Sequence, residues 1–419
     1  MNTNKQFWLG FIAFLFLIGA ICILPYLFTS RSWFGLDFSN TGGVGDTIGG
    51  IMGPFIAIIA AVLTFLAFWV QYQANIQQRN QFLQQIKEQN IEKAAQEKVW
   101  HVERFENNYF ELIRLHRDNV NPLKYTKFTL NGMATAEGRK VFRVIFKEFF
   151  ECFREVKRFS KSKDPDDYYK PKYKNKIQAI ISTTNPRIDL VELAQIDIAY
   201  SIVFFGVGDE GEIVLRHRFL KRYKDEYFYR LLKYFRLKPK REDQIVYSKW
   251  EIVQNMKIKE RREVLNELYN FRTFQNEEIL SLAARTVLTR IPFEKYYGGH
   301  QHRLGHYFRH LFQSYKYLNE QVSLTDDQKY FYGKMLRAQL STYEQLLLFI
   351  NSISSLGMKW EFTPDTSNDL QLSAEEIVKY KNERKLITKY QLIKNLPGDH
   401  YFKIRFKSYY PNIRYEDDE

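Results

Sequence analysis

The sequence predicts a mainly α-helical protein with an N-terminal hairpin of two transmembrane helices, a long stalk helix and a large, all-helical cytosolic domain. Two uncharged runs near the N-terminus are each long enough to cross a bilayer. More than 40 residues after the second run lack glycine and proline, which indicates one long helix. Farther along, apolar residues recur mostly with helical spacing.

The two apolar runs are residues 7–28, with 22 residues, and residues 48–70, with 23. At about 1.5 Å per residue each reaches roughly 33 Å, and a hydrocarbon core is about 30 Å thick. A cleaved signal peptide is the alternative for the first run, but no small-x-small cleavage site follows it. We therefore expect residues 1–70 to form a two-span hairpin.

The distribution of charge predicts the orientation of this hairpin. Residues 1–70 carry two basic and two acidic side chains, so the net charge of +14 lies after Val70. Basic residues that begin with Arg79 follow the second span, which places the N-terminus and the C-terminal domain in the cytoplasm. The two cysteines, Cys22 and Cys152, form no disulfide framework, as expected in a reducing cytosol.

A glycine-rich segment, GGVGDTIGGIMGPF (42–55), leads into the second apolar run and overlaps its start. Its spacing fits neither GxGxxG nor a P-loop, and no lysine follows to meet a phosphate. Gly49 and Gly53 form GxxxG, which lets helices approach closely in lipid. Pro54 lies in the first turn of the span or kinks it, and Asp46 caps the turn or faces an ion path. We expect these four residues to serve membrane packing or a pore.

Residues 71–120 are predicted to form the stalk helix, with Ile76, Leu83, Ile86 and Ala94 as a thin coiled-coil seam. The cytosolic domain, 121–419, is predicted to contain helices over 137–158, 188–205, 212–236, 245–270, 274–291, 302–319, 326–353 and 374–394. A basic segment near 157–176 contains proline, serine and charge and is predicted to be an exposed loop.

The run KRYKDEYFYRLLKYFRLKPKR (221–241) is both basic and aromatic. Cations bind phosphates and rings stack on bases, so contact with nucleic acid is one interpretation. An amphipathic helix with a solvated basic face is a second, and contact with anionic lipid heads is a third. The sequence leaves these three open.

Four histidines lie within 11 residues, in GGHQHRLGHYFRHLFQSYKYL (298–318). Apolar residues occupy one face of this predicted helix, and His302, His306, Arg309 and His310 fall on the opposite face. No cysteine or carboxylate stands nearby to complete a metal site, so we expect no metal and no cofactor. A polar face packed against another helix is favoured.

The partner helix that we expect is YFYGKMLRAQLSTYEQLLLFINS (330–352). Arg337 and Glu344 line one flank of its apolar ridge, and Gln339 lies near the apolar side, where a buried amide needs a partner. We therefore expect a buried polar network of Arg309, Arg337, Gln339 and Glu344.

A catalytic interpretation of the same region is a ribonuclease of the HEPN type. HEPN-type ribonucleases are all-helical and use an Arg and a His separated by four to six residues. Arg303 and His310 have six residues between them and fall within roughly 20° of one helix face. His306, Arg309 and Glu344 are further catalytic candidates.

Three blocks carry a resemblance: GDTIGGIMGPF (45–55), GHYFRHLFQSYKYL (305–318) and RAQLSTYEQLLLFIN (337–351). With its short N-terminal span, the chain resembles the AbiC-like phage abortive infection proteins of bacteria over nearly its whole length. The resemblance implies a dormant, multi-pass protein of the bacterial inner membrane that arrests or kills its host upon infection. It supplies no catalytic residues.

The leading hypothesis is a membrane effector whose helical domain senses infection and whose hairpins oligomerise to disrupt the inner membrane or arrest growth. A membrane-tethered HEPN-like ribonuclease and a scaffold that recruits another effector are the alternatives. The expected partners are the lipid bilayer, further copies of the chain, and a phage protein trigger or an operon partner. Contact with nucleic acid stays open.

Overall fold

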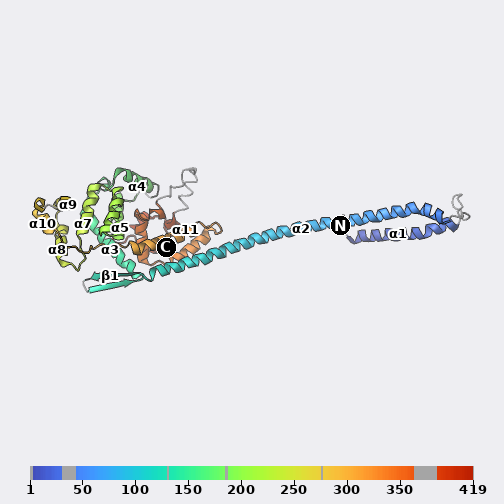
Figure 1. Cartoon of the computed structure of the whole chain (residues 1–419), viewed down its shortest axis with the longest axis horizontal. Helices are drawn as coiled ribbons and strands as arrows, with labels where there is room; N and C mark the ends of the chain where they lie inside the picture. The colour runs from blue at the N-terminus through green and yellow to red at the C-terminus, as the bar shows by residue number, and fades with distance from the viewer. Residues whose placement is uncertain are drawn as a thin grey trace. The chain divides into compact units, whose positions relative to one another are not determined.

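The structure is a computed structural model, and it describes residues 3–30, 44–129, 132–184, 187–274, 277–362 and 385–418 (Figure 1). The chain divides into two compact units, Met1–Val99 and Trp100–Glu419. We call the second unit the C-terminal body. Each unit is described by itself.

The N-terminal unit consists of α1 (Thr3–Ser30) and the first part of α2 (Val44–Val120). The part of α2 from Met52 to Val120 contains an 18-residue window with a mean hydropathy of 2.3, which is long and apolar enough to cross a membrane. The described apolar run of α1, Gly10–Ile21, is shorter. One span is therefore compatible with the described helices by length and composition, and the two-span hairpin stays a prediction.

Two details of α2 differ from the predicted second span. The helix begins at Val44, so Pro54 lies inside it rather than in its first turn. The seam residues Ile76, Leu83 and Ile86 are exposed, so coiled-coil pairing also stays a prediction.

The C-terminal body starts with the end of α2 and a hairpin of β1 (Lys124–Thr129) and β2 (Gly132–Glu137), which pair antiparallel. The helices that follow are α3 (Lys140–Phe159), α4 (Pro171–Thr184), α5 (Leu190–Phe205), α6 (Asp209–Leu220), α7 (Asp225–Leu237), α8 (Gln244–Asn255), α9 (Ile258–Phe274), α10 (Leu282–Val287), α11 (Gln301–Asn319), α12 (Asp326–Arg337), α13 (Thr342–Ile353), α15 (Leu386–Lys389) and α16 (Phe406–Tyr409). In the described residues, 3-10 turns lie between or after them at Pro165–Asp167, Glu277–Ile279, Met358–Trp360 and Glu416–Asp418.

Helix α5 forms the centre of the C-terminal body. Most of its residues are apolar and 13 of its 16 residues are buried, as expected of a helix that is surrounded on most sides. It packs against α3, α6, α11 and α13. Asp189 caps its start by accepting a hydrogen bond from the Val191 amide at 2.8 Å. The elements that carry the candidate site are therefore held by this helix.

The main difference from the predicted fold is that four long helices are broken. The ranges 212–236, 245–270, 274–291 and 326–353 each contain a break, and the hairpin β1–β2 was not predicted. The segment 157–176 contains the end of α3, a 3-10 turn and the start of α4, rather than one loop. Most of the predicted helix 374–394 lies outside the described residues. The fold is nevertheless mainly helical, as predicted.

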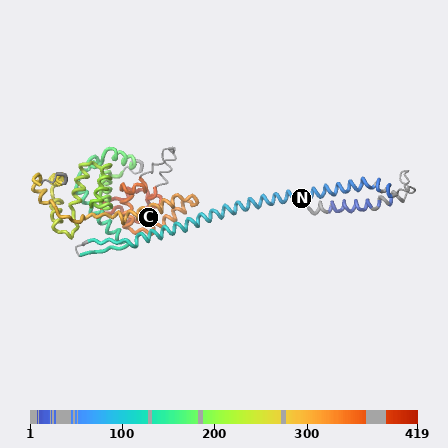
Figure 2. Tube along the Cα trace, viewed as in Figure 1, coloured from blue at the N-terminus to red at the C-terminus, as the bar shows by residue number. Residues whose placement is uncertain are grey.

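The C-terminal segment 385–418 packs against α11 and α12. Figure 2 follows the chain from these helices, in orange, to this red segment. Tyr390 contacts the ring of Tyr315, with 5.2 Å between centroids, and its carbonyl accepts a hydrogen bond from Arg337 at 3.1 Å. The last residues thus complete the core around α11.

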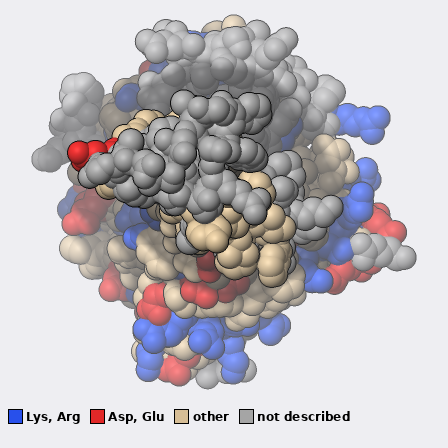
Figure 3. All heavy atoms as spheres, turned by 90° about the vertical axis from the view of Figure 1, so that its right-hand side faces the viewer, with Lys and Arg blue, Asp and Glu red and all other residues tan. Residues whose placement is uncertain are grey.

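The basic aromatic run 221–241 lies mostly in α7, and its rings are largely core residues. Tyr223, Phe228 and Phe235 are fully buried. In the coloured part of the face in Figure 3, Lys and Arg side chains form separate groups with Asp and Glu among them. On this face the positive charge is divided rather than gathered in one patch.

Candidate functional site

A cavity of about 750 Å³ opens along the polar face of α11. We call it the α11 cavity. Its basic lining comes from His302, His306 and Arg309 on α11 and from Lys359 in the Met358–Trp360 turn. Its aromatic lining comes from α5, α11 and the same turn, namely Phe204, Phe205, Phe308, Phe312 and Trp360. The cavity thus combines cations with rings.

Two glycines bring the end of α5 against the start of α11. Gly206 and Gly299 have φ of 77° and 88°, a region that side chains rarely adopt. A Cβ on Gly206 would lie 2.6 Å from the Gly298 carbonyl carbon, and one on Gly299 would lie 2.6 Å from the Phe205 oxygen. The His300 amide donates to the Phe204 carbonyl at 2.9 Å. Bare backbone therefore forms this wall of the cavity.

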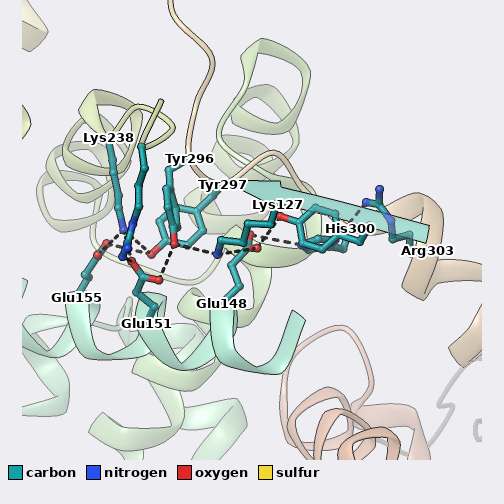
Figure 4. A network of polar contacts seen from close by, with 11 residues as sticks. Lys127, Glu148, Glu151, Glu155, Lys238, Tyr296, Tyr297, His300 and Arg303 are labelled. Carbon is teal, nitrogen blue, oxygen red and sulfur yellow. Dashed lines mark hydrogen bonds and ion pairs between the residues drawn. The ribbon is translucent and has the colours of Figure 1, made fainter. Parts of the chain in front are cut away.

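A buried network behind this wall holds the start of α11 (Figure 4). We call it the α3 network, because its three carboxylates, Glu148, Glu151 and Glu155, come from one face of α3. The Nζ atom of Lys238 lies 2.7 Å from Glu155 and 2.8 Å from Glu151. Lys238 is itself only 1% exposed, and a buried cation requires such partners.

Two tyrosines before α11 complete this half of the α3 network. Tyr296 donates to Glu151 at 2.6 Å, and Tyr297 donates to Glu155 at 3.1 Å. Burial acts to raise the pKa of both carboxyls. The charge and hydrogen bonds of Lys238, with the Tyr296 hydroxyl, outweigh burial at Glu151 and lower its pKa. At Glu155 burial dominates, and its pKa is raised.

The other half of the α3 network centres on Glu148 and His300, both nearly fully buried. Tyr125 donates to Glu148 at 2.9 Å, and His300 Nε2 lies 3.4 Å from the other carboxylate oxygen. Arg303 lies 3.3 Å from His300 Nδ1. A guanidinium can only donate, so Nδ1 accepts and the ring's Nε2 proton faces Glu148. Burial acts to raise the pKa of Glu148, but His300, Lys127 and Tyr125 together lower it.

The α3 network positions α11 rather than forming an open site. Its groups mainly contact one another, and its members do not line the α11 cavity. It joins α3, β1 and the segment after α7 to the residues that lead into α11. Glutamates at i, i+3 and i+7 beside the apolar face of α3 are the sequence signal that could have indicated it.

The predicted site residues fall into separate environments. His306 and Arg309 line the α11 cavity. Arg303 instead donates to the Lys124 carbonyl at 3.0 Å and stacks on Tyr125, while His310 donates to the Leu112 carbonyl at 3.0 Å. The Arg303 and His310 side chains thus contact different elements.

The four residues of the predicted polar network are not gathered in one cluster. Glu344 is fully buried, but its partners are Tyr307 at 3.1 Å, Ser341 at 2.8 Å and Arg139 at 3.8 Å. The Gln339 carbonyl accepts a hydrogen bond from Arg139 at 2.7 Å. Arg337 donates to the backbone carbonyls of Tyr390 and Gln391, and Arg309 faces the α11 cavity.

The predicted membrane residues lie at the start of α2. Asp46, Gly49, Gly53 and Pro54 are all exposed. A Cβ added at Gly49 or Gly53 would meet no atom within 4 Å. As to metals, no group of three or more His, Cys, Asp or Glu is arranged to hold an ion in the part of the chain that the structure describes.

Residues 299–363 match the family model described as putative phage abortive infection protein. The match supports an AbiC-like family assignment. No curated protein and no solved structure matches the chain significantly. The matched residues, which we call the AbiC-like segment, contain α11, α12, α13 and the Lys359 turn, and therefore most of the α11 cavity.

The end of α2 packs on the AbiC-like segment through an aromatic cluster. The Phe105 ring lies 5.7 Å from that of Tyr317 and 5.0 Å from that of Tyr332. Tyr109 donates to the Tyr332 carbonyl at 3.0 Å. One face of the last turns of α2 is thus part of the core of the C-terminal body.

His116 lies farther along the same face of α2. Its ring is 5.2 Å from that of Tyr307 and 6.1 Å from that of His310. It is 1% exposed, and neither ring nitrogen has a hydrogen-bond partner among the described residues. Burial, with the charges of His310 and Arg139, lowers the pKa of His116 to about 4. His116 is therefore neutral at physiological pH.

Proposed function

We propose that this protein is an abortive-infection effector of the bacterial inner membrane. The match of the AbiC-like segment supports a role in phage defence. In the proposal the C-terminal body senses infection, and the N-terminal helices then assemble and disrupt the membrane or arrest growth. The N-terminus and the C-terminal body are cytoplasmic, and α1 and the start of α2 are the two spans.

The observation that carries the proposal is that α2 holds both a membrane-length apolar stretch and a docked end. None of its most apolar window is buried, whereas Phe105, Tyr109 and His116 are buried against the AbiC-like segment. Exposed side chains such as Phe65 and Phe68 need a nonpolar surrounding. Residues of α11 therefore contact the same helix whose apolar stretch would enter the bilayer. A structural change at α11 would act directly on that helix.

A row of small residues supports assembly within the membrane. At about 100° per residue, Ala57, Ala60, Thr64 and Ala67 fall on the same face of α2 as Gly49 and Gly53. Small residues in such a row let helices pack closely in lipid. Thr64 already satisfies its hydroxyl by donating to the Ala60 carbonyl at 2.7 Å. We propose a homo-oligomer that forms along this face.

The test compares three strains under phage challenge while membrane potential is recorded. Wild type is expected to depolarise and to protect the culture. Gly53→Leu, at an equal protein level, is expected to lose both effects because the added side chain separates the helices. Val62→Leu adds bulk on the opposite face of α2 and is the matched control, expected to keep both.

The same experiment separates the alternatives. A steady potential in wild-type cells that nonetheless arrest contradicts the membrane mechanism. If tRNA and mRNA are also degraded in those cells, the HEPN-like ribonuclease is favoured. Arrest that requires a second encoded protein favours the scaffold.

A further inference from the structure

The α11 cavity presents two cations that no carboxylate of the described chain neutralises. Arg309 and Lys359 are exposed on its lining, and neither forms an ion pair with any described residue. Among the described residues of the lining, Glu210 supplies the one carboxylate. His302 and His306 add two imidazoles. The positive charge of the described lining therefore favours an anionic ligand.

The aromatic side of the cavity is built into the core. Trp360 is 2% exposed, and its ring meets that of Phe312 edge-on at 5.1 Å. Phe308 and Phe204 are likewise mostly buried. These core rings hold the half-buried Phe312 in place, so a planar ligand that packs on Phe312 orders few side chains.

The bare backbone wall leaves room between these two sides. A Cβ on Gly298 would meet no atom within 4 Å, so this residue borders open space. The cavity volume of about 750 Å³ lies within the range of roughly 300 to 1,000 Å³ that small-molecule sites occupy.

We propose that the α11 cavity binds a free nucleotide. Its base would pack on the half-buried ring of Phe312, at the edge of the aromatic side, and its phosphates would bind Arg309 and Lys359. A planar guanidinium suits phosphate oxygens, and aromatic rings accept any base. This is a binding function and involves no bond cleavage.

The proposal goes beyond membrane effector function and does not depend on it. Binding is a property of the C-terminal body alone. Only the further idea that the nucleotide is the infection signal rests on the proposed function. A chain that binds nucleotide while cells keep their membrane potential would leave this inference standing and remove the effector mechanism.

The experiment measures binding to the purified full-length chain in detergent by equilibrium dialysis. The probes are ATP and AMP, with adenosine and inorganic phosphate as the two halves of the ligand. We expect the nucleotides to bind at least tenfold more tightly than either half, because only they engage both sides of the cavity.

Two variants remove the cations and a third is matched to them. Arg309→Ala and Lys359→Ala are each expected to weaken ATP binding about tenfold, which is the loss of one charge-assisted contact. Lys316→Ala removes a partly buried lysine of the same helix outside the cavity and is expected to bind as wild type does. Glu210→Gln removes the opposing carboxylate and is expected to tighten binding severalfold.

Each other outcome overturns the proposal. Binding that is absent from the wild-type chain, or unchanged in both Arg309→Ala and Lys359→Ala, shows that the cavity is not a nucleotide site. Inorganic phosphate that binds as tightly as ATP shows a simple anion site. A single-stranded oligonucleotide that binds while ATP and AMP do not shows a nucleic-acid site instead.

Discussion

His116 is the residue at which burial and protonation are most directly opposed. Its pKa is lowered to about 4 in the folded chain, whereas an unfolded chain restores a value of about 6.5. Below pH 6.5 the unfolded chain therefore binds a proton that the folded chain does not. The free energy of unfolding therefore keeps its full value above about pH 6.5 and falls as the pH drops toward 4.

Replacement of His116 by phenylalanine should remove this dependence on pH. Between pH 7 and pH 5 the histidine is expected to cost the wild-type chain about 2 kcal/mol, from about 1.4 kcal/mol per pKa unit. Urea unfolding of the full chain at both pH values checks this. His101→Phe alters an exposed histidine of the same helix and should behave as wild type. Equal losses in wild type and His116→Phe would contradict the assignment.

Glu344 shows how one residue can be noticed correctly and assigned the wrong neighbours. The sequence places it in a polar patch with Arg309. In the structure it is the third residue of α13 and caps that helix with Ser341, while Tyr307 donates to it. The spacing S-x-x-E indicates such a cap from sequence alone. The hydrogen bond from Tyr307 required the packing of α11 on α13.

At the scale of elements, helix breaks follow from local chemistry that periodicity alone does not reveal. Thr325 with Gln328 and Ser341 with Glu344 each form a capping box, so α12 and α13 start separately although the apolar spacing runs through both. The antiparallel pair β1–β2 places Tyr125 and Lys127 near Glu148. A mainly helical pattern gave no signal for that contact.

The continuity of α2 leads to a prediction about signalling. Insertion of a seven-residue Gly-Ser segment after Asn90 should abolish protection while protein level and membrane association persist, because the helix no longer connects its two ends. A seven-residue insertion of alanine, lysine and glutamate at the same place extends the helix by about two turns and should retain protection. Phage plating efficiency on the two strains is the measurement. Full protection with the Gly-Ser insertion would show that α2 carries no signal.

At the scale of the whole molecule, the predicted topology can be tested with the chain's own cysteines as background. Cys152 is buried, and the sequence places Cys22 inside the first span, so the wild-type chain should label weakly. Ser39→Cys, in the predicted outer loop, is expected to react with an impermeant maleimide in intact cells. Val322→Cys, which is 98% exposed in the C-terminal body, should react only after permeabilisation. Labelling of Val322→Cys in intact cells would contradict the predicted orientation.

The sequence by itself determined the helical class, the apolar stretch of α2 and the polar face of α11. These features depend on spacing within one segment, and helix geometry converts spacing into a face. It also indicated His306 and Arg309, which do line one cavity.

Only the tertiary structure decided which charges are buried together. Glu148 meets His300, Lys238 meets Glu151 and Glu155, and the α11 cavity takes its walls from α5, α11 and the Lys359 turn. A carboxylate tolerates burial only when a partner reaches it, and these partners come from distant parts of the chain. No local pattern could therefore show where they meet.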